Sequence, residues 1–164
     1  MLADEADGPS LLGKEVTVKG WVRTIRSQKT FSFIEVNDGS SLGGVQVVAD
    51  AGQVPGYEAA IAGIHTGAAI GVVGTIKESP GKGQKYEVQA ARVEVIGGCD
   101  PDTYPLQKKR HTLEFLRGIA HLRPRTNTLG AVARVRSALA FATHKFFQDQ
   151  GFYYLQVHTY MHTP

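Results

Sequence analysis

The sequence predicts a mainly β fold, in which a small closed barrel of five strands is followed by a linker and one long helix. Five segments rich in β-branched residues lie between residues 14 and 96, and glycine-containing turn sequences separate them. Apolar residues take up helical spacing only after residue 127. The 164 residues, 42% hydrophobic and 20% charged, have the composition of an ordinary globular protein, so we expect one complete domain and part of another.

The first strand is expected over Lys14–Arg26, with a bend near Gly20. Val16 and Val18 recur among polar neighbours, which is the alternation of a half-buried strand. Trp21 falls in the same segment. We expect its ring to lie in the barrel core with the indole N–H at the rim.

The second and third strands, residues 31–37 and 45–48, are expected to form a hairpin. The sequence Asn37-Asp38-Gly39-Ser40 between them is typical of a turn. Strand alternation puts Phe31 and Phe33 on one face and the aliphatic residues of the same strand on the other.

A short helix over residues 57–64 and two further strands, residues 69–77 and 85–96, complete the first domain. Five strands with a helix between the third and fourth is the layout of a five-stranded Greek-key barrel, the OB-fold, and we place this domain at residues 12–98. A small β-sandwich is the alternative.

Residues 99–126 are rich in proline and charge and lack a clear period, so we interpret them as a hinge or linker. A helix follows from Asn127 to Gln150, with Asn127 able to cap its start and Gly151 placed to stop it. The second, incomplete domain is expected to begin here and to span 127–164. The apolar residues at helical spacing include Val132, Val135, Leu139, Ala142 and Phe146.

Charge is distributed unevenly along the chain. Residues 1–100 carry nine Lys/Arg against twelve Asp/Glu, whereas residues 101–164 carry nine against three. A basic segment favours polyanions such as RNA through counterion release, although many solvated faces are basic too.

Several other classes of protein are disfavoured. Cys99 is the only cysteine, which allows no internal disulfide or multi-cysteine metal site and suits a reducing compartment. Residues 1–10 resemble neither a secretory signal nor a transit peptide. The longest apolar stretch, residues 67–76, is too short to span a bilayer, so we expect no membrane role. The expected location is cytoplasmic.

The outer face of the second and third strands is where single-stranded nucleic acid lies on an OB-fold. Phe33 can stack under a base, and Arg26, Gln46 and Glu87 can contact base edges or phosphates around it. The opposite assignment is that the alternation is inverted and Phe33 belongs to the core.

Two short motifs do not carry the chemistry that their letters suggest. Gly39-Ser40-Ser41-Leu42-Gly43 spells a hydrolase pattern but lies in a hairpin turn, whereas a nucleophile elbow joins a strand to a helix. Gly81-Lys82-Gly83 lacks P-loop spacing. In this loop Lys82 and Lys85 can touch a phosphate, although solvated lysines are the ordinary alternative. No histidine pair has metal-ligand spacing within a helix, so no metal is expected.

Three stretches resemble the N-terminal barrel of the class IIb aminoacyl-tRNA synthetases, the aspartyl, asparaginyl and lysyl group. They are Val16–Arg23, Phe33–Ser40 and Val45–Val48. A second set, Tyr104–His111, Glu114–Arg117 and Ala120–Asn127, is similar to the hinge and catalytic entry of the asparaginyl-tRNA synthetases. The chain thus resembles an N-terminal fragment of that family.

The resemblance implies roles for particular residues. Phe33 matches the aromatic residue that stacks on the central anticodon base, while Arg26, Gln46 and Glu87 match positions that contact the anticodon. The helix from Asn127 and the residues after it resemble motif 1, the helix and strand through which class II synthetases form homodimers. Taken alone it is an ordinary amphipathic helix. The resemblance implies a dimer interface that includes Val132, Val135, Leu139 and Phe146.

The chain departs from the family pattern after Gly151-Phe152, because the family usually reaches Thr-Pro quickly and this chain does so only at Pro164. Motifs 2 and 3, which hold ATP and magnesium in this class, are expected beyond that point. The resemblance implies that the full-length enzyme attaches asparagine to its tRNA through an adenylate, using ATP and Mg²⁺. This chain is expected to bind tRNA, to carry no catalytic residue and to need no cofactor.

Two other functions stay open. One is a stand-alone OB-fold module that binds nucleic acid loosely, and the other is a dimerisation piece acting through residues 127–150. A cytoplasmic location is expected for the parent enzyme, and an organellar one is the alternative.

Overall fold

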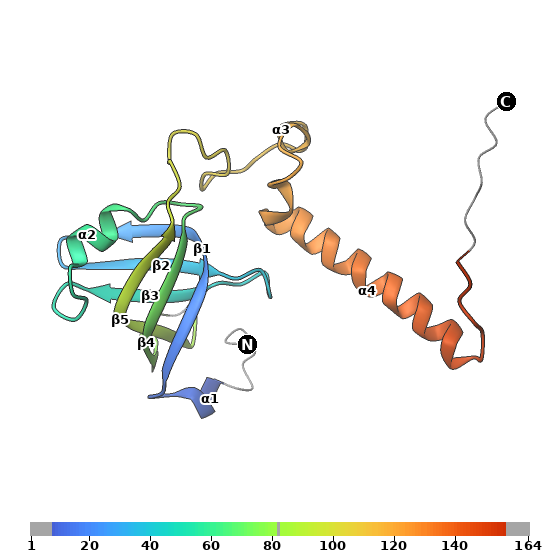
Figure 1. The fold of residues 1–164 in the computed structure, drawn as a ribbon, viewed down its shortest axis with the longest axis horizontal. Coiled ribbons are helices and arrows are strands. Elements are labelled where there is room, and N and C mark those ends of the chain that lie inside the picture. The colour runs from blue at the N-terminus through green and yellow to red at the C-terminus, as the bar shows by residue number, and fades with distance from the viewer. Residues whose placement is uncertain (1–7, 82, 157–164) are drawn as a thin grey trace. The chain divides into compact units, whose positions relative to one another are not determined.

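The computed structural model describes residues 8–81 and 83–156, which divide into two compact units between Leu122 and Arg123. The first unit contains a barrel and short helices (Figure 1). Its elements are α1 Gly8–Leu11, β1 Glu15–Ser27, β2 Phe31–Asn37, β3 Val45–Asp50, α2 Tyr57–Ala62, β4 Ala69–Glu78, β5 Tyr86–Gly97 and α3 Leu113–Gly118.

The strands close into a barrel in the order β1-β2-β3-β5-β4. The long strand β1 serves two neighbours, because residues 15–21 pair with β4 and residues 21–27 pair with β2, both antiparallel. A parallel pairing of β3 with β5 completes the ring. This order is that of a five-stranded Greek-key barrel, and it confirms the predicted mainly β fold.

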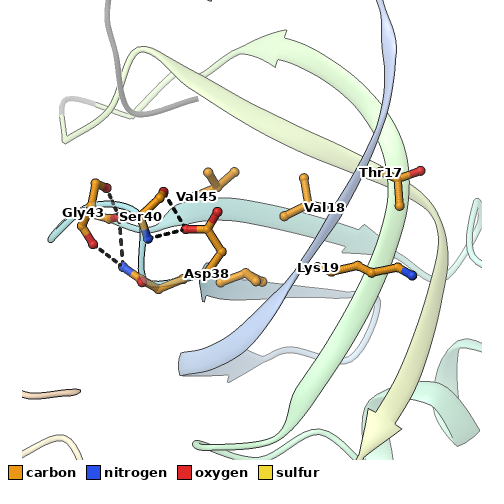
Figure 2. A pocket seen from close by; sticks show the side chains of 10 residues that line it. Thr17, Val18, Lys19, Asp38, Ser40, Gly43 and Val45 are labelled. Carbon is orange, nitrogen blue, oxygen red and sulfur yellow. Dashed lines mark hydrogen bonds between the residues drawn. The ribbon is translucent and has the colours of Figure 1, made fainter. Parts of the chain in front are cut away.

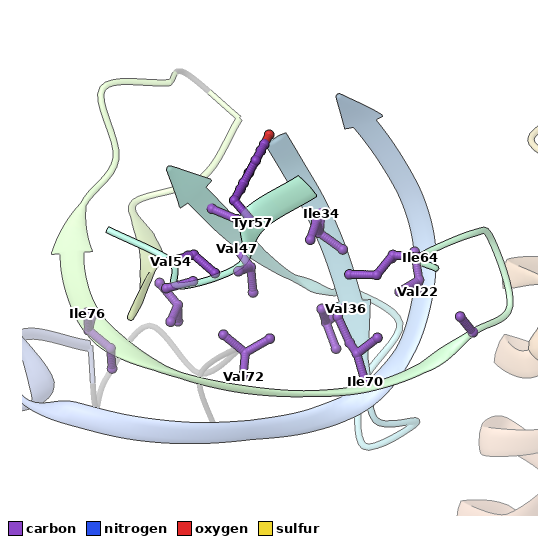
Figure 3. Packing of buried hydrophobic residues seen from close by; sticks show 14 residues of the cluster. Val22, Ile34, Val36, Val47, Val54, Tyr57, Ile64, Ile70, Val72 and Ile76 are labelled. Atoms are coloured by element: carbon purple, nitrogen blue, oxygen red, sulfur yellow. The ribbon is translucent and has the colours of Figure 1, made fainter. Parts of the chain in front are cut away.

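The core is made mainly by alternating residues of the strands. Along β2, Ser32, Ile34 and Val36 are buried, while Phe31 and Phe33 are only partly so. Fully burying one Val or Ile side chain contributes about 1.5–3 kcal/mol, so the inward set fixes which face each strand turns to the core. Figure 3 shows aliphatic side chains of β1, β2, β3 and β4 meeting inside the barrel, with Tyr57 of α2 beside them. Val88 and Ala90 of β5 belong to the same cluster.

Trp21 corrects one expectation, because its side chain is 42% exposed rather than part of the core. The adjacent Val22 is 1% exposed and takes the inward position, so alternation turns Trp21 outward. Trp21 lies where β1 passes from one neighbour to the other, since it pairs with both Asn37 and Ala69.

Two glycines allow strands of the barrel to approach closely. A Cβ on Gly20 would lie 2.8 Å from the carbonyl oxygen of Asn37, and one on Gly74 would lie 2.2 Å from that of Gln89. The pairing of β4 with β5 shifts register between Val73 and Gly74. These two glycines therefore lie where the backbone of the neighbouring strand occupies the space that a side chain would take.

The helix α2 is tied to the barrel through one buried hydrogen bond. The hydroxyls of Ser32 and Tyr57 lie 2.7 Å apart, and both residues are buried. A buried hydroxyl needs such a partner, so this pair fixes the start of α2 against β2.

The segment expected to be a linker contains a helix that no period in the sequence indicated. Thr112 caps α3, because its hydroxyl accepts from the backbone N–H of Phe115 at 3.3 Å. Leu116 is 4% exposed, and the rings of His111 and Phe115 stack with centroids 5.2 Å apart. A helix of six residues is too short to show amphipathic periodicity, which explains why it was missed.

The second unit consists of a 3₁₀ turn, Arg123–Arg125, and the helix α4, Asn127–Asp149. Thr126, rather than Asn127, is the N-cap, and its hydroxyl donates to the carbonyl of Arg123 at 2.7 Å. With Thr126 as the cap, the helix begins at Asn127, one residue earlier than a cap at Asn127 would require.

The stop at Gly151 is confirmed and has the geometry of a Schellman motif. Gly151 has φ +84°, its N–H donates to Gln148 and the N–H of Phe152 donates to Phe147, both at 3.0 Å. The rings of Phe147 and Phe152 are in contact, with centroids 5.6 Å apart. Residues 152–156 form no strand, and residues 157–164 lie outside the described part of the chain.

We expect Gly74→Ala to destabilise the barrel by about 1–3 kcal/mol or more, since the added methyl meets the Gln89 backbone. Gly71→Ala in the same strand is the control, because its nearest new contact is at 3.6 Å and its effect should stay within about 0.5 kcal/mol. Urea unfolding of the two variants measures both values. Equal losses would contradict the close approach.

Candidate nucleic-acid interface

Strand register brings two of the predicted site residues together. Arg26 on β1 lies opposite Phe33 on β2, and Phe33 lies opposite Val48 on β3. Val48 pairs in turn with Gln89 on β5. Residues directly opposite in a sheet share a face, so these four side chains form one row across the outside of the barrel.

Phe33 lies on the outer face, as the alternation predicted, and the alternative in which it joins the core is excluded. Its inward neighbours Ser32 and Ile34 are each 0% exposed, whereas Phe33 is half-buried. The ring of Phe31 meets the ring of Phe33 edge to face, with centroids 5.3 Å apart and planes at 84°. Edge-to-face contact is a favourable arrangement of two aromatic rings, so it stabilises the orientation of Phe33.

A polar row runs beside the Phe33 row. Glu35 on β2 pairs with Thr24 on one side and with Gln46 on the other, and the Thr24 hydroxyl donates to Glu35 Oε2 at 3.2 Å. Gln46 Nε2 donates to Glu87 Oε2 at 3.4 Å. The parallel pairing of β3 with β5 produces this last contact, because it brings strands together that are distant in the sequence.

Glu87 is a carboxylate that is only 7% exposed. Besides Gln46, it accepts a hydrogen bond from the hydroxyl of Ser79, with 2.9 Å between Ser79 Oγ and Glu87 Oε2. Burying a charged group is costly unless it is hydrogen-bonded, so these donors compensate for its burial and fix its position. Gln46 and Glu87 together place an amide and an acceptor in the polar row beside the Phe33 row.

The loop between β4 and β5 is folded around Ser79. Its hydroxyl oxygen accepts from the backbone N–H of Gly81 at 3.2 Å and from Gln84 Nε2 at 3.4 Å, while donating to Glu87. Lys85 is exposed at the end of this loop. Lys82, the other predicted phosphate contact, lies outside the described residues.

The polar side chains of the hairpin turn between β2 and β3 form hydrogen bonds within the turn (Figure 2). Asn37 Nδ2 donates to the carbonyls of Ser41 and Gly43 at 3.2 and 2.9 Å. The Ser41 hydroxyl also donates to the Gly43 carbonyl, at 2.7 Å, so it is a turn hydroxyl with no activating base among its bonds here. A hollow of about 170 Å³ lies beside this turn, and none of Arg26, Phe33, Gln46 or Glu87 lines it.

The predicted interface residues of α4 share one exposed side of that helix, within the second unit. Val135, Leu139 and Phe146 follow Val132 by three, seven and fourteen residues. In a helix of 3.6 residues per turn these spacings bring the side chains to nearly the same angle around the axis. The exposed fractions are 57% for Val132, 58% for Val135, 64% for Leu139 and 61% for Phe146.

The described residues contain no group of three or more His, Cys, Asp and Glu side chains that could hold a metal ion. Among the same residues, no helix is both long enough and apolar enough to span a membrane.

Sequence reasoning missed the residues that support the site. Phe31 was placed on the correct face, but its contact with Phe33 was not predicted. The link from Ser79 to Glu87 left no signal, because a serine in a Ser-Pro-Gly turn is expected whether or not its hydroxyl reaches a carboxylate. Only the pairing of β4 with β5 brings the two together.

Comparison with known proteins agrees with this geometry. Residues 16–96 match the family described as OB-fold nucleic acid binding domain. The chain is 58% identical over 155 residues to an asparagine–tRNA ligase of Protochlamydia amoebophila, which covers 94% of this chain and 32% of that protein. An asparagine–tRNA ligase of a Synechocystis strain is 58% identical over 145 residues, covering 88% and 31%.

A solved structure extends the likeness to the fold. The asparaginyl-tRNA synthetase of Entamoeba histolytica in complex with asparaginyl-adenylate matches with a TM-score of 0.80 at 26% identity, covering 98% of this chain and 38% of that one. The chain therefore spans about a third of the length of the curated relatives that it matches.

Asp38 in the hairpin turn gives a test by titration. The hydroxyl and then the backbone N–H of Ser40 donate to its carboxylate and hold the pKa of Asp38 below its usual range. A lowered folded pKa adds stability above the unfolded pKa, and this is lost as pH falls through the folded value. We expect Ser40→Ala to raise the pKa of Asp38 in an NMR titration.

Ser41→Ala is the matched control, because that hydroxyl donates to Gly43 and not to Asp38. The pKa of Asp38 should be unchanged in this variant. A pKa of Asp38 that stays the same in Ser40→Ala would show that the turn is bonded differently.

Proposed function

Since the chain belongs by sequence to the asparagine–tRNA ligase family and spans about a third of its relatives' length, we propose that its barrel binds the anticodon loop of the asparagine tRNA. The observation that carries the proposal is the orientation of Phe33. Its ring lies on the outer face of a nucleic-acid-binding fold, braced by Phe31 and flanked by Arg26 and by the bonded pair of Gln46 and Glu87.

Each of the four residues has a role that follows from its chemistry. Phe33 stacks on an unpaired base, a contact available to any base because every base has a π-face. Gln46 and Glu87 offer a hydrogen-bond donor beside an acceptor, which suits a base edge that carries an acceptor beside a donor, as uracil does. Arg26 is exposed at the edge of the same row and contacts a phosphate or a second base.

Lys82 and Lys85 supply phosphate contacts from the loop between β4 and β5. Such contacts position a nucleic acid without reading its sequence, because they neutralise phosphate charge and release counterions. The anchoring of this loop to Glu87 through Ser79 ties the phosphate-binding lysines to the base-reading face.

The division of the chain that follows from this function has three parts. Residues 12–98 are the anticodon-binding domain, residues 99–126 are a hinge, and residues 127–164 begin a catalytic domain. The full-length enzyme attaches asparagine to its tRNA with ATP and Mg²⁺, and this chain alone binds tRNA without catalysing the reaction. We place the enzyme in the cytoplasm, with an organelle as the alternative.

The long helix serves association of two copies in the full-length enzyme. Four apolar side chains more than half exposed on one side of α4 are costly in water and favour burial against a partner.

Phe33→Ala should weaken binding of an asparagine-type anticodon stem-loop by about 1–3 kcal/mol, because the stacking surface is removed. Fluorescence anisotropy against stem-loops of asparagine, aspartate and lysine identity measures affinity and selectivity together. The central anticodon base of all three is uracil, so the loss should occur with each of them.

The control is Phe141→Ala, since that ring is 70% exposed on α4 and belongs to no proposed contact. Its affinity should equal that of the unmodified chain. Weak binding with the same affinity for all three stem-loops, unchanged by Phe33→Ala, would indicate a generic OB-fold nucleic-acid-binding module instead.

Association through α4 is tested by sedimentation at micromolar concentration without RNA, where we expect self-association of the chain. Leu139→Glu should abolish it, because a charge would be buried in the interface. Leu42→Glu is the control, since Leu42 is 48% exposed in the hairpin turn of the barrel. A strictly monomeric chain, or equal loss in both variants, would exclude this role.

A further inference from the structure

The segment that leaves the barrel after β5 packs against a glycine. Residues 99–118, which we call the strap, run from just after β5 to the end of α3 (Figure 1). Gly67, in the loop before β4, has φ +93°. A Cβ on Gly67 would lie 2.8 Å from Tyr104 Cζ and 2.9 Å from Cys99 Sγ. The Tyr104 ring and the Cys99 sulfur therefore occupy the space that any other side chain at position 67 would need.

Gly67 belongs to the wall of the barrel. Its N–H donates to the carbonyl of Val22 at 2.8 Å, and the N–H of Val22 donates to the carbonyl of Ala68 at 2.8 Å. Val22 and Ala68 are 1% and 0% exposed. Buried backbone groups keep their hydrogen-bond partners, so these two bonds fix the surface on which Tyr104 lies.

Next to Tyr104 the strap is hydrogen-bonded to itself. The Tyr104 N–H donates to the carbonyl of Asp100 at 3.0 Å. Gln107 Nε2 donates to the carbonyls of Pro101 and Tyr104, at 2.8 and 3.0 Å. One amide thus closes this stretch into a compact loop, in which residues 104–107 are half-buried.

The bonded structure continues into α3. His111 Nε2 lies 3.0 Å from the carbonyl oxygen of Gln107, which accepts a hydrogen bond from it. The imidazole of His111 stacks on Phe115, with ring planes at 16°. Since Leu116 is 4% exposed, α3 also has a buried side chain. Contacts that each span three or four positions therefore connect Tyr104 with α3.

We propose that the packing of Tyr104 on Gly67 holds the strap against the barrel, so that residues 99–118 move with the barrel as one body. The freedom of the hinge is then confined to residues 119–126, and the division of the chain into its two units falls in this range. The inference goes beyond the proposed function and does not depend on what the barrel binds.

The consequence is a short joint. A flexible linker of n residues has an end-to-end distance of about 5–6 Å × √n. Freedom confined to residues 119–126, instead of the whole hinge over residues 99–126, roughly halves that distance. The strap therefore shortens the flexible part of the chain between the two units.

Tyr104→Ala tests the anchor, because it removes the ring and leaves the backbone bonds possible. The measurement is amide hydrogen exchange by NMR in the whole 164-residue chain. The matched control is Tyr153→Ala, whose side chain is 92% exposed in the second unit. Gln107→Ala removes the two bonds of that amide, and Gln148→Ala at an exposed position of α4 is its control.

In the unmodified chain the amides of residues 104 and 116, which donate to Asp100 and Thr112, should exchange slowly. Tyr104→Ala should speed their exchange by about tenfold or more, because a partly buried aromatic side chain no longer opposes local opening. Gln107→Ala should speed it by a smaller factor. The amides of β2 and β3 should exchange as before, and the two control variants should change neither set.

Backbone ¹⁵N relaxation tests whether the strap moves with the barrel. The order parameters of the strap amides should equal those of the β-strands, about 0.85, and those of residues 119–126 should be lower. Tyr104→Ala should lower the order parameters of residues 100–107.

Three outcomes overturn the inference. Strap order parameters as low as those of residues 119–126 in the unmodified chain would show that the strap moves independently of the barrel. Unchanged exchange in Tyr104→Ala would show that the ring does not hold the strap. Equal acceleration in β2 and in the strap would show that the ring stabilises the barrel as a whole instead.

Discussion

Closure of the barrel is the constraint on which the rest of the structure depends. Once β1 pairs with both β2 and β4, and β3 with β5, every strand has one face committed to a sealed interior. Gly20 and Gly74 permit this closure, because a side chain at either position would collide with the backbone of the next strand. The outward positions do not contribute to the core, and the aromatic and polar residues of the candidate site occupy them.

Glu87 shows how the site is prepared before any ligand arrives. A carboxylate this deeply buried must be hydrogen-bonded, and its donors come from β3 and from the β4–β5 loop. The same bonds hold Gln46 and that loop in place. Phe33 is fixed differently, by the edge-to-face contact with Phe31 and by the hydrogen bond between the hydroxyls of its neighbour Ser32 and of Tyr57. Groups that are fixed in advance lose less entropy on binding, so a preformed face favours affinity.

The second unit follows other physical rules. The end of α4 is set locally, because the glycine at position 151 adopts φ +84° and the rings of Phe147 and Phe152 cover the last turn. Its apolar side, in contrast, lacks burial in the described chain, with Leu139 64% exposed. A helix of this kind obtains most of its stability from what packs on it. This agrees with a chain that spans about a third of its relatives' length.

The sequence by itself determined the strands, the alternation that turned Phe33 outward, the hairpin turn at Asn37 and the stop at Gly151. All of these depend on neighbours within a few positions, where side-chain period and backbone preference act directly. Only the tertiary structure decided the exposure of Trp21 at the point where β1 changes partners, and the bond from Ser79 to Glu87. Such contacts depend on which strands become neighbours when the barrel closes, and the local preferences of the residues do not determine this.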